Sequence, residues 1–218
     1  MSWRAAVAIM VVAAALVIPP RQCHADAAME MLQRALRATE QVQDYTATVA
    51  VTVDSPSLQI PRRTAKVYFK QPDMINVEAT GLMVIPRDAL MLGNLSEHLE
   101  RYATASFIGS GTLDGRPVRS IKLSPRESGG RGGRVLLWID TERHLLLKSE
   151  IWRENERRLS VNFRHARVAG HYWMPERIVA EMSPGAITRR DEGGRVEIVF
   201  SNYRVNTGLA DSIFKGSN

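Results

Sequence analysis

Histidines are the side chains of this chain that could bind a metal ion or transfer protons near neutral pH. Past residue 24 there are four, and none stands at His-x-His or His-x-x-x-His spacing from another: His98, His144, His165 and His171. The single cysteine, Cys23, lies in a segment that we expect to be removed on export, so it cannot complete a ligand set. The sequence therefore predicts no metal site.

Patterns for nucleophilic and acid–base catalysis are also missing. Ser110 stands between Gly109 and Gly111 in a predicted turn, without the strand-to-helix context of a nucleophile elbow. Glu154 and Glu156 flank an asparagine in another turn, where a solvated role is the simpler interpretation. Residues distant in sequence can converge in a fold, but the local motifs predict no catalytic residue, no cofactor and no enzymatic activity.

The first 25 residues have the features of a secretory signal peptide. Arg4 supplies a positive charge, an apolar run follows over 5–18, and small residues at Cys23 and Ala25 suit cleavage before Asp26. We expect a periplasmic protein cleaved near Ala25; an uncleaved anchor is the alternative. The residues before Cys23 argue against its lipidation. The expected organisation is a signal peptide over 1–25 and one domain over 26–218.

The charge balance argues against a nucleic-acid partner. The chain has 29 basic and 23 acidic residues, and two of the basic ones, Arg4 and Arg21, lie in the signal segment. The mature chain then has a net charge of +4 at pH 7, with arginines scattered along predicted strands. Such a distribution is typical of a solvated sheet face rather than a basic groove.

The rest of the chain is rich in short alternating strands. An amphipathic helix is predicted over 26–43 with Asp26 as its N-cap, and one or two short helices over 86–103. The Asp114-Gly115 pair predicts a tight hairpin. Strands are predicted at 45–53, 63–70, 74–79, 106–113, 116–123, 134–140, 145–153, 158–168, 173–182 and 195–205. Sequential hairpins of this kind give antiparallel pairing.

Several segments resemble the LolA/LolB-like superfamily of periplasmic lipoprotein-sorting proteins. These segments are Lys66-Val-Tyr-Phe-Lys-Gln-Pro-Asp73, Asp114-Gly-Arg-Pro-Val-Arg-Ser-Ile-Lys-Leu-Ser-Pro125, Leu137-Trp-Ile-Asp140, Trp173-Met-Pro175 and the closing Tyr203–Phe214. The resemblance spans most of the mature chain. It implies a half-open antiparallel β-barrel, mainly β, with an N-terminal helix and short lid helices over an apolar cavity.

The function that the resemblance implies is a non-catalytic carrier. Such a protein would act as a monomeric chaperone that binds the acyl chains of lipoproteins or lipids and transfers them between envelope membranes. An inner-membrane transporter or an outer-membrane acceptor would be its partner. The stretch from Gly115 to Ile151 also resembles RseB-like regulators, so the alternative is a periplasmic sensor that binds a membrane-anchored anti-sigma partner.

Strand alternation suggests which side chains would line the cavity, although packing in a closed core is the commoner role of any single apolar strand residue. The expected lining residues are Val49, Val51, Val67, Phe69, Leu136, Trp138, Leu147, Val161 and Phe163. The expected lid residues are Leu32, Leu36, Leu95 and Leu99.

One position departs from the family pattern. The lipoprotein carriers have an arginine before the proline of the Lys-Gln-Pro-Asp segment, where it ties the sheet to the lid helices. This chain has Gln71 at that lid-latch position, and a glutamine cannot form a charge-assisted hydrogen bond. A divergent carrier, or a binder of another lipid, therefore suits the sequence better than the housekeeping carrier.

Overall fold

The structure is a computed structural model that describes residues 21–56, 58–79, 102–125, 133–185 and 192–215. It contains one α-helix, ten strands and a short 3₁₀ helix over these residues. The helix is α1 (Arg21–Glu40) and the 3₁₀ helix is η1 (Asp211–Phe214). The strands are β1 (Asp44–Ser55), β2 (Leu58–Lys70), β3 (Met74–Ala79), β4 (Tyr102–Leu113), β5 (Arg116–Pro125), β6 (Arg134–Asp140), β7 (Leu146–Arg153), β8 (Glu156–Val168), β9 (Tyr172–Met182) and β10 (Gly194–Val205).

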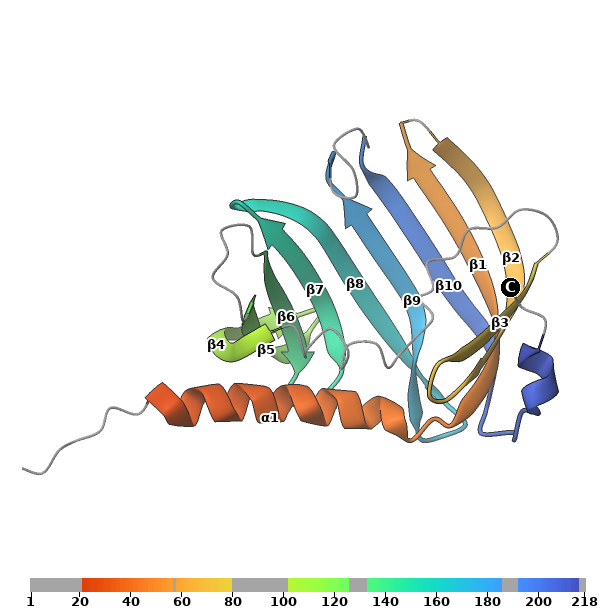
Figure 1. Cartoon of the computed structure of the whole chain (residues 1–218), viewed down its shortest axis with the longest axis horizontal. Coiled ribbons are helices and arrows are strands. Elements are labelled where there is room, and N and C mark those ends of the chain that lie inside the picture. The colour runs from red at the N-terminus through yellow and green to blue at the C-terminus, as the bar shows by residue number, and fades with distance from the viewer. Residues whose placement is uncertain (1–20, 57, 80–101, 126–132, 186–191, 216–218) are drawn as a thin grey trace, which may run out of the picture.

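All ten strands form one antiparallel sheet with the order β3-β2-β1-β10-β9-β8-β7-β6-β5-β4. Consecutive strands pair as a meander from β4 to β10, and β10 then pairs with β1. The sheet curves strongly and its edge strands β3 and β4 do not meet, which gives a half-open barrel with α1 lying along one end of the strands (Figure 1).

The predicted strands and the predicted hairpin are confirmed. Asp114 and Gly115, at φ 49° and 75°, connect β4 to β5, and both lie in the left-handed region that a two-residue turn of this type needs. The helix start is wrong, because α1 begins at Arg21 and Asp26 lies inside it rather than at its N-cap. The short helices expected over 86–103 fall outside the described residues, except that 102 and 103 begin β4.

Candidate functional site: the inner face of the sheet

Strand register defines the two faces of the sheet. Directly opposed residues in an antiparallel pair point to the same side. One such row runs across the sheet from β1 to β8, through Val51, Ile198, Ile178 and Phe163. A parallel row runs from Val196 in β10 to Phe107 in β4, by way of Ala180, Val161, Ser149, Leu137 and Ile121. We call the side of these rows the inner face and the opposite side the outer face.

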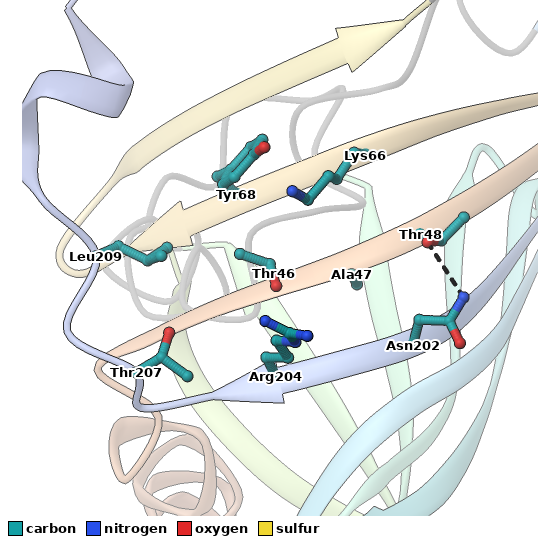
Figure 2. A pocket seen from close by; sticks show the side chains of 9 residues that line it. All are labelled: Thr46, Ala47, Thr48, Lys66, Tyr68, Asn202, Arg204, Thr207 and Leu209. Carbon is teal, nitrogen blue, oxygen red and sulfur yellow. Dashed lines mark hydrogen bonds between the residues drawn. The ribbon is translucent and has the colours of Figure 1, made fainter.

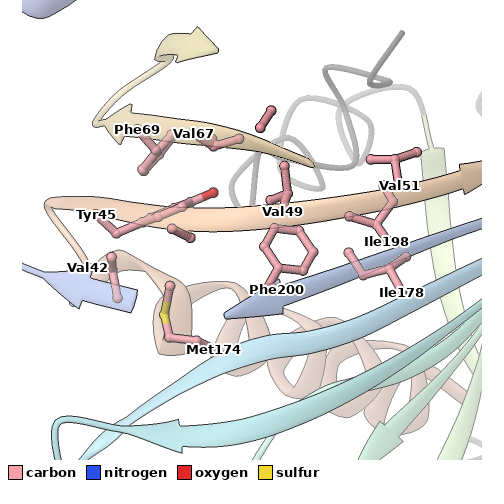
Figure 3. Close-up of a cluster of buried hydrophobic side chains, with 12 residues drawn as sticks. Val42, Tyr45, Val49, Val51, Val67, Phe69, Met174, Ile178, Ile198 and Phe200 are labelled. Carbon is pink, nitrogen blue, oxygen red and sulfur yellow. The ribbon is translucent and has the colours of Figure 1, made fainter. Parts of the chain in front are cut away.

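One half of the inner face carries a large apolar cluster (Figure 3). Four of the predicted lining residues belong to its buried part: Val49, Val51, Val67 and Phe69. Two more, Val161 and Phe163, are half-buried and pack against it from β8. The described buried members of this cluster come from strands and from Val42, which follows the helix, and none comes from residues 27–37 of α1. Six of the nine predicted lining residues thus share one apolar surface.

The other half of the inner face is covered by α1. Leu32 is fully buried, and with Ala28 and Ala35 it packs on Ile121 of β5 and Leu137 of β6. Leu36, predicted beside Leu32 in the lid, is half-buried. The helix thereby covers the inner-face residues of β4–β6. Leu95 and Leu99, the other two predicted lid residues, lie outside the described residues.

Three predicted lining residues lie on the outer face, so their assignment to the concave side is wrong. Leu136 and Trp138 alternate with Val135, Leu137 and Ile139, which are the buried inner-face residues of β6. The run from Val135 to Ile139 is apolar throughout, so alternation could not decide which residues point inward. Leu147 lies at an irregularity in the β6–β7 pairing and joins a small outer cluster with Trp138.

Cations cover the tryptophans of the outer face. The Lys148 ammonium lies 4.8 Å from the centre of the Trp138 ring, and the Arg134 guanidinium lies at the same distance from Trp152. Burial alone would raise the pKa of Glu150, but hydrogen bonds from Lys148 and the Trp152 indole outweigh that effect and lower it. These contacts explain how large aromatic side chains occur on the wet side of the sheet.

Gln71, the predicted lid-latch residue, connects the β2–β3 turn to the segment between α1 and β1. Its side-chain Nε2 donates to the carbonyl oxygen of Val42 at 2.9 Å, and its backbone N–H donates to the Gln43 carbonyl at 2.8 Å. The glutamine therefore does form a tie near the end of the helix, with a neutral hydrogen bond in place of a charged one.

A buried carboxylate, Asp44, anchors the chain after β10 to the start of β1. Its oxygens accept backbone N–H groups from Thr207 at 2.8 Å, Gly208 at 2.9 Å and Leu209 at 3.3 Å. The Thr207 hydroxyl adds a fourth hydrogen bond at 3.3 Å. Asp44 is only 4% exposed, so these donors replace the water that it loses on folding. No local sequence motif predicts this site, because its partners are more than 160 residues away.

A second buried polar group lies at the opposite side of the sheet. Asp140 is fully buried, and the Arg116 guanidinium lies 2.6 Å from its Oδ2 as an ion pair without hydrogen-bond alignment. Its other oxygen accepts the backbone N–H groups of Glu142 and Arg143. Desolvation and, to a lesser degree, the Arg116 charge lower the pKa of His165 to about 4, against a smaller opposing effect of Asp140.

The outer face also bears a pocket of about 430 Å³ where β10, β1 and β2 meet the segment after β10 (Figure 2). Most of its lining residues carry a polar group, and they include two cations and several hydroxyl groups. The lining residues are Thr46, Ala47, Thr48, Lys66, Tyr68, Asn202, Arg204, Thr207 and Leu209.

The described residues show neither a metal-binding cluster nor a membrane-spanning helix. Within the described ranges, histidines, cysteines and carboxylates form no group of three that could hold a metal ion. No helix in the same ranges combines the length and the apolar character needed to cross a membrane.

A comparison with protein-family models identifies the family of this chain. A protein-family model described as "uncharacterized protein" matches residues 90–218, which is more than half of the chain. The chain belongs to this family. The search of curated protein sequences gave no match.

Solved structures extend the comparison to most of the chain. One is described as an outer membrane lipoprotein-sorting protein domain from Vibrio parahaemolyticus, with a TM-score of 0.63, 14% identity and coverage of 87% of this chain and 97% of that one. A DUF1329 family protein from Desulfovibrio piger has a TM-score of 0.66 at 16% identity, covering 89% and 98%. A LolA superfamily protein from Nitrosomonas europaea has a TM-score of 0.56 at 13% identity, covering 86% and 97%. The chain therefore shares the fold of these three structures.

Proposed function

We propose that this protein is a non-catalytic periplasmic carrier that binds the acyl chains of lipids or lipoproteins on its inner face and transfers them between membranes. The observation that carries the proposal is the apolar half of that face, which extends over β1, β2 and β8–β10 and takes no buried member from residues 27–37 of α1. The shared fold supports it, since two of the similar structures are described as lipoprotein-sorting or LolA proteins.

The energetics of such binding follow from apolar area. Each methylene moved from water into an apolar site contributes about 0.8 kcal/mol, so eight buried methylenes contribute roughly 6 kcal/mol. The half-buried rim of Val161, Phe163 and Val196 offers apolar surface that a chain could cover without displacing the fully buried residues. An acyl chain would lie along this rim.

The two faces of the sheet supply a matched pair of variants. Val161 is half-buried on the inner face, and Leu136 is half-buried on the outer face. We expect Val161→Asp to weaken the uptake of a fluorescent fatty acid by at least tenfold, because a carboxylate would then be desolvated by the chain. Leu136→Asp should leave uptake within twofold of the wild type.

The experiment uses the full chain expressed with its own N-terminal segment and purified from the periplasm. Circular dichroism and thermal unfolding confirm that both variants fold, and mass spectrometry of the intact protein reports the N-terminus and any co-purified lipid. A first residue at Asp26 would support processing after Ala25. No probe uptake by delipidated wild-type protein, or an equal loss in both variants, would refute acyl binding on the inner face. Retention of a polypeptide partner that lipid displaces would favour a sensor instead.

A further inference from the structure

We propose that the outer-face pocket binds a phosphate-like oxyanion, either free phosphate or the phosphate of a lipid headgroup. The polar side chains that β1 and β2 contribute to the pocket lie on the opposite side of these strands from the inner cluster; they are Thr46, Thr48, Lys66 and Tyr68. Thr46 and Thr48 alternate with Ala47 and Val49 along β1, and only Ala47 and Val49 belong to the inner cluster. Its volume of about 430 Å³ is within the usual range for small-molecule sites, about 300–1,000 Å³.

The charge of the lining is the main argument. Among the lining residues that the structure describes, the charged ones are Lys66 and Arg204 (Figure 2), and both are exposed. Lys66 lies over the Tyr68 ring, with its ammonium 4.6 Å from the ring centre, and Arg204 has no ion pair with any described residue. The cross-strand neighbour of Lys66 is Glu78, whose carboxylate accepts the Tyr68 hydroxyl at 2.9 Å and is not within ion-pair distance of Lys66.

Three other cations of the outer face lie in ion pairs. Arg177 lies 2.7 Å from Glu197, Arg195 lies 2.9 Å from Glu181, and Lys148 lies 2.8 Å from Glu150. Each of these three cations is neutralised by a carboxylate, whereas Lys66 and Arg204 have no ion pair among the described residues and line the same pocket. A concave surface with one sign of charge concentrates the potential and attracts an oppositely charged ligand.

Hydrogen-bond donors complete the site. The Thr48 hydroxyl oxygen accepts from the Asn202 amide at 3.4 Å, which leaves the Thr48 proton available to a ligand. The Thr46 hydroxyl has no side-chain partner within the described part of the chain. An arginine guanidinium matches the geometry of phosphate oxygens, and hydroxyl protons can reach the remaining ones.

The C-terminal wall of the pocket is fixed by contacts outside it. Leu209 donates its N–H to Asp44, and its carbonyl accepts from the Lys70 ammonium at 2.8 Å. Lys70 also pairs with Asp211 at 2.6 Å, and Asn76 of β3 donates to the Ile213 carbonyl at 2.6 Å. These bonds order the segment after β10 before any ligand arrives, which reduces the entropic cost of binding.

Calorimetric titration of the full chain with inorganic phosphate, at constant ionic strength, tests the site. We expect saturable binding that weakens roughly tenfold in Lys66→Gln and in Arg204→Gln, because each removes one charge-assisted contact, and that is lost in the double variant. Arg167→Gln is the matched control: it removes an exposed charge from β8, away from the pocket, and should change the affinity less than twofold. No saturable binding by the wild type, or equal binding by the double variant, would overturn the proposal.

Vesicles distinguish the two sources of the oxyanion. If the ligand is a headgroup, the wild type should co-sediment with phosphatidylglycerol vesicles, and the double variant should not. If phosphate binds in solution but co-sedimentation is the same for both proteins, the ligand is a soluble phosphate compound. Val161→Asp, designed for the inner face, should leave phosphate binding unchanged, so failure of one proposal can be told from failure of the other.

Discussion

Replacement of Asp44 by alanine tests how the chain closes its sheet. The substitution removes the acceptor of two short hydrogen bonds, from the Thr207 and Gly208 N–H groups, and of two longer ones at 3.3 Å. A buried donor left without a partner costs about 1–3 kcal/mol. Thr207 and Gly208 are themselves exposed, so water can replace part of the loss. We therefore expect the free energy of unfolding to fall by about 2–4 kcal/mol.

Urea denaturation followed by circular dichroism measures this change. Asp54→Ala is the control, because Asp54 lies at the other end of the same strand and is exposed; we expect less than about 0.5 kcal/mol there. Hydrogen exchange should show faster exchange of the Thr207 and Gly208 amides in Asp44→Ala alone. Equal stability of the two variants, with unchanged exchange after β10, would refute the anchoring role of this carboxylate.

Two further predictions concern the buried groups at the other side of the sheet. Arg116→Met should lower the free energy of unfolding by about 3–5 kcal/mol, because it leaves the fully buried Asp140 charge unpaired. Adding Asp140→Asn should recover part of this loss in the same urea assay. A wild-type midpoint of unfolding for the single variant would contradict the prediction. The pKa of His165 is about 4 in the folded protein, below the usual 6.5, so the folded state binds fewer protons than the unfolded state between these values. Stability should therefore fall by up to about 3 kcal/mol as the pH drops from 6.5 to 4, and a His165→Gln variant that keeps the full pH dependence would show that another group is responsible.

The strands were predictable from the sequence because their signals are local. Ala65, Val67 and Phe69 alternate with polar residues, so the pattern indicates both a strand and the side chains that point inward. The structure buries all three. The Asp114-Gly115 turn likewise needs only two residues to specify it. β6 was harder, because five consecutive apolar residues fit either face. Its register with β5 and β7, which the run itself does not encode, decides that Leu137 rather than Leu136 points inward.

The helix start and the outer pocket were missed for different reasons. Asp26 is a residue type that often caps a helix, but it cannot be the N-cap here because the helix begins at Arg21 and continues through it. The pocket combines Thr46 and Lys66 near one end of the chain with Arg204 near the other, and only the pairing of β1 with β10 brings them together. Single residues such as these carry no motif, so the sequence held no signal for them.

Strand β1 belongs to both candidate sites. Val49 and Val51 project from it toward the inner apolar cluster, and Thr46 and Thr48 project toward the outer pocket. Since successive residues of a strand point to opposite faces, a slip of one residue would move the valines into the wet pocket and the threonines into the apolar face. The hydrogen bonds of Asp44 to the segment after β10 fix the register of β1 at its first residue. The same anchor therefore keeps the apolar and the cationic surface each on its own side of one strand.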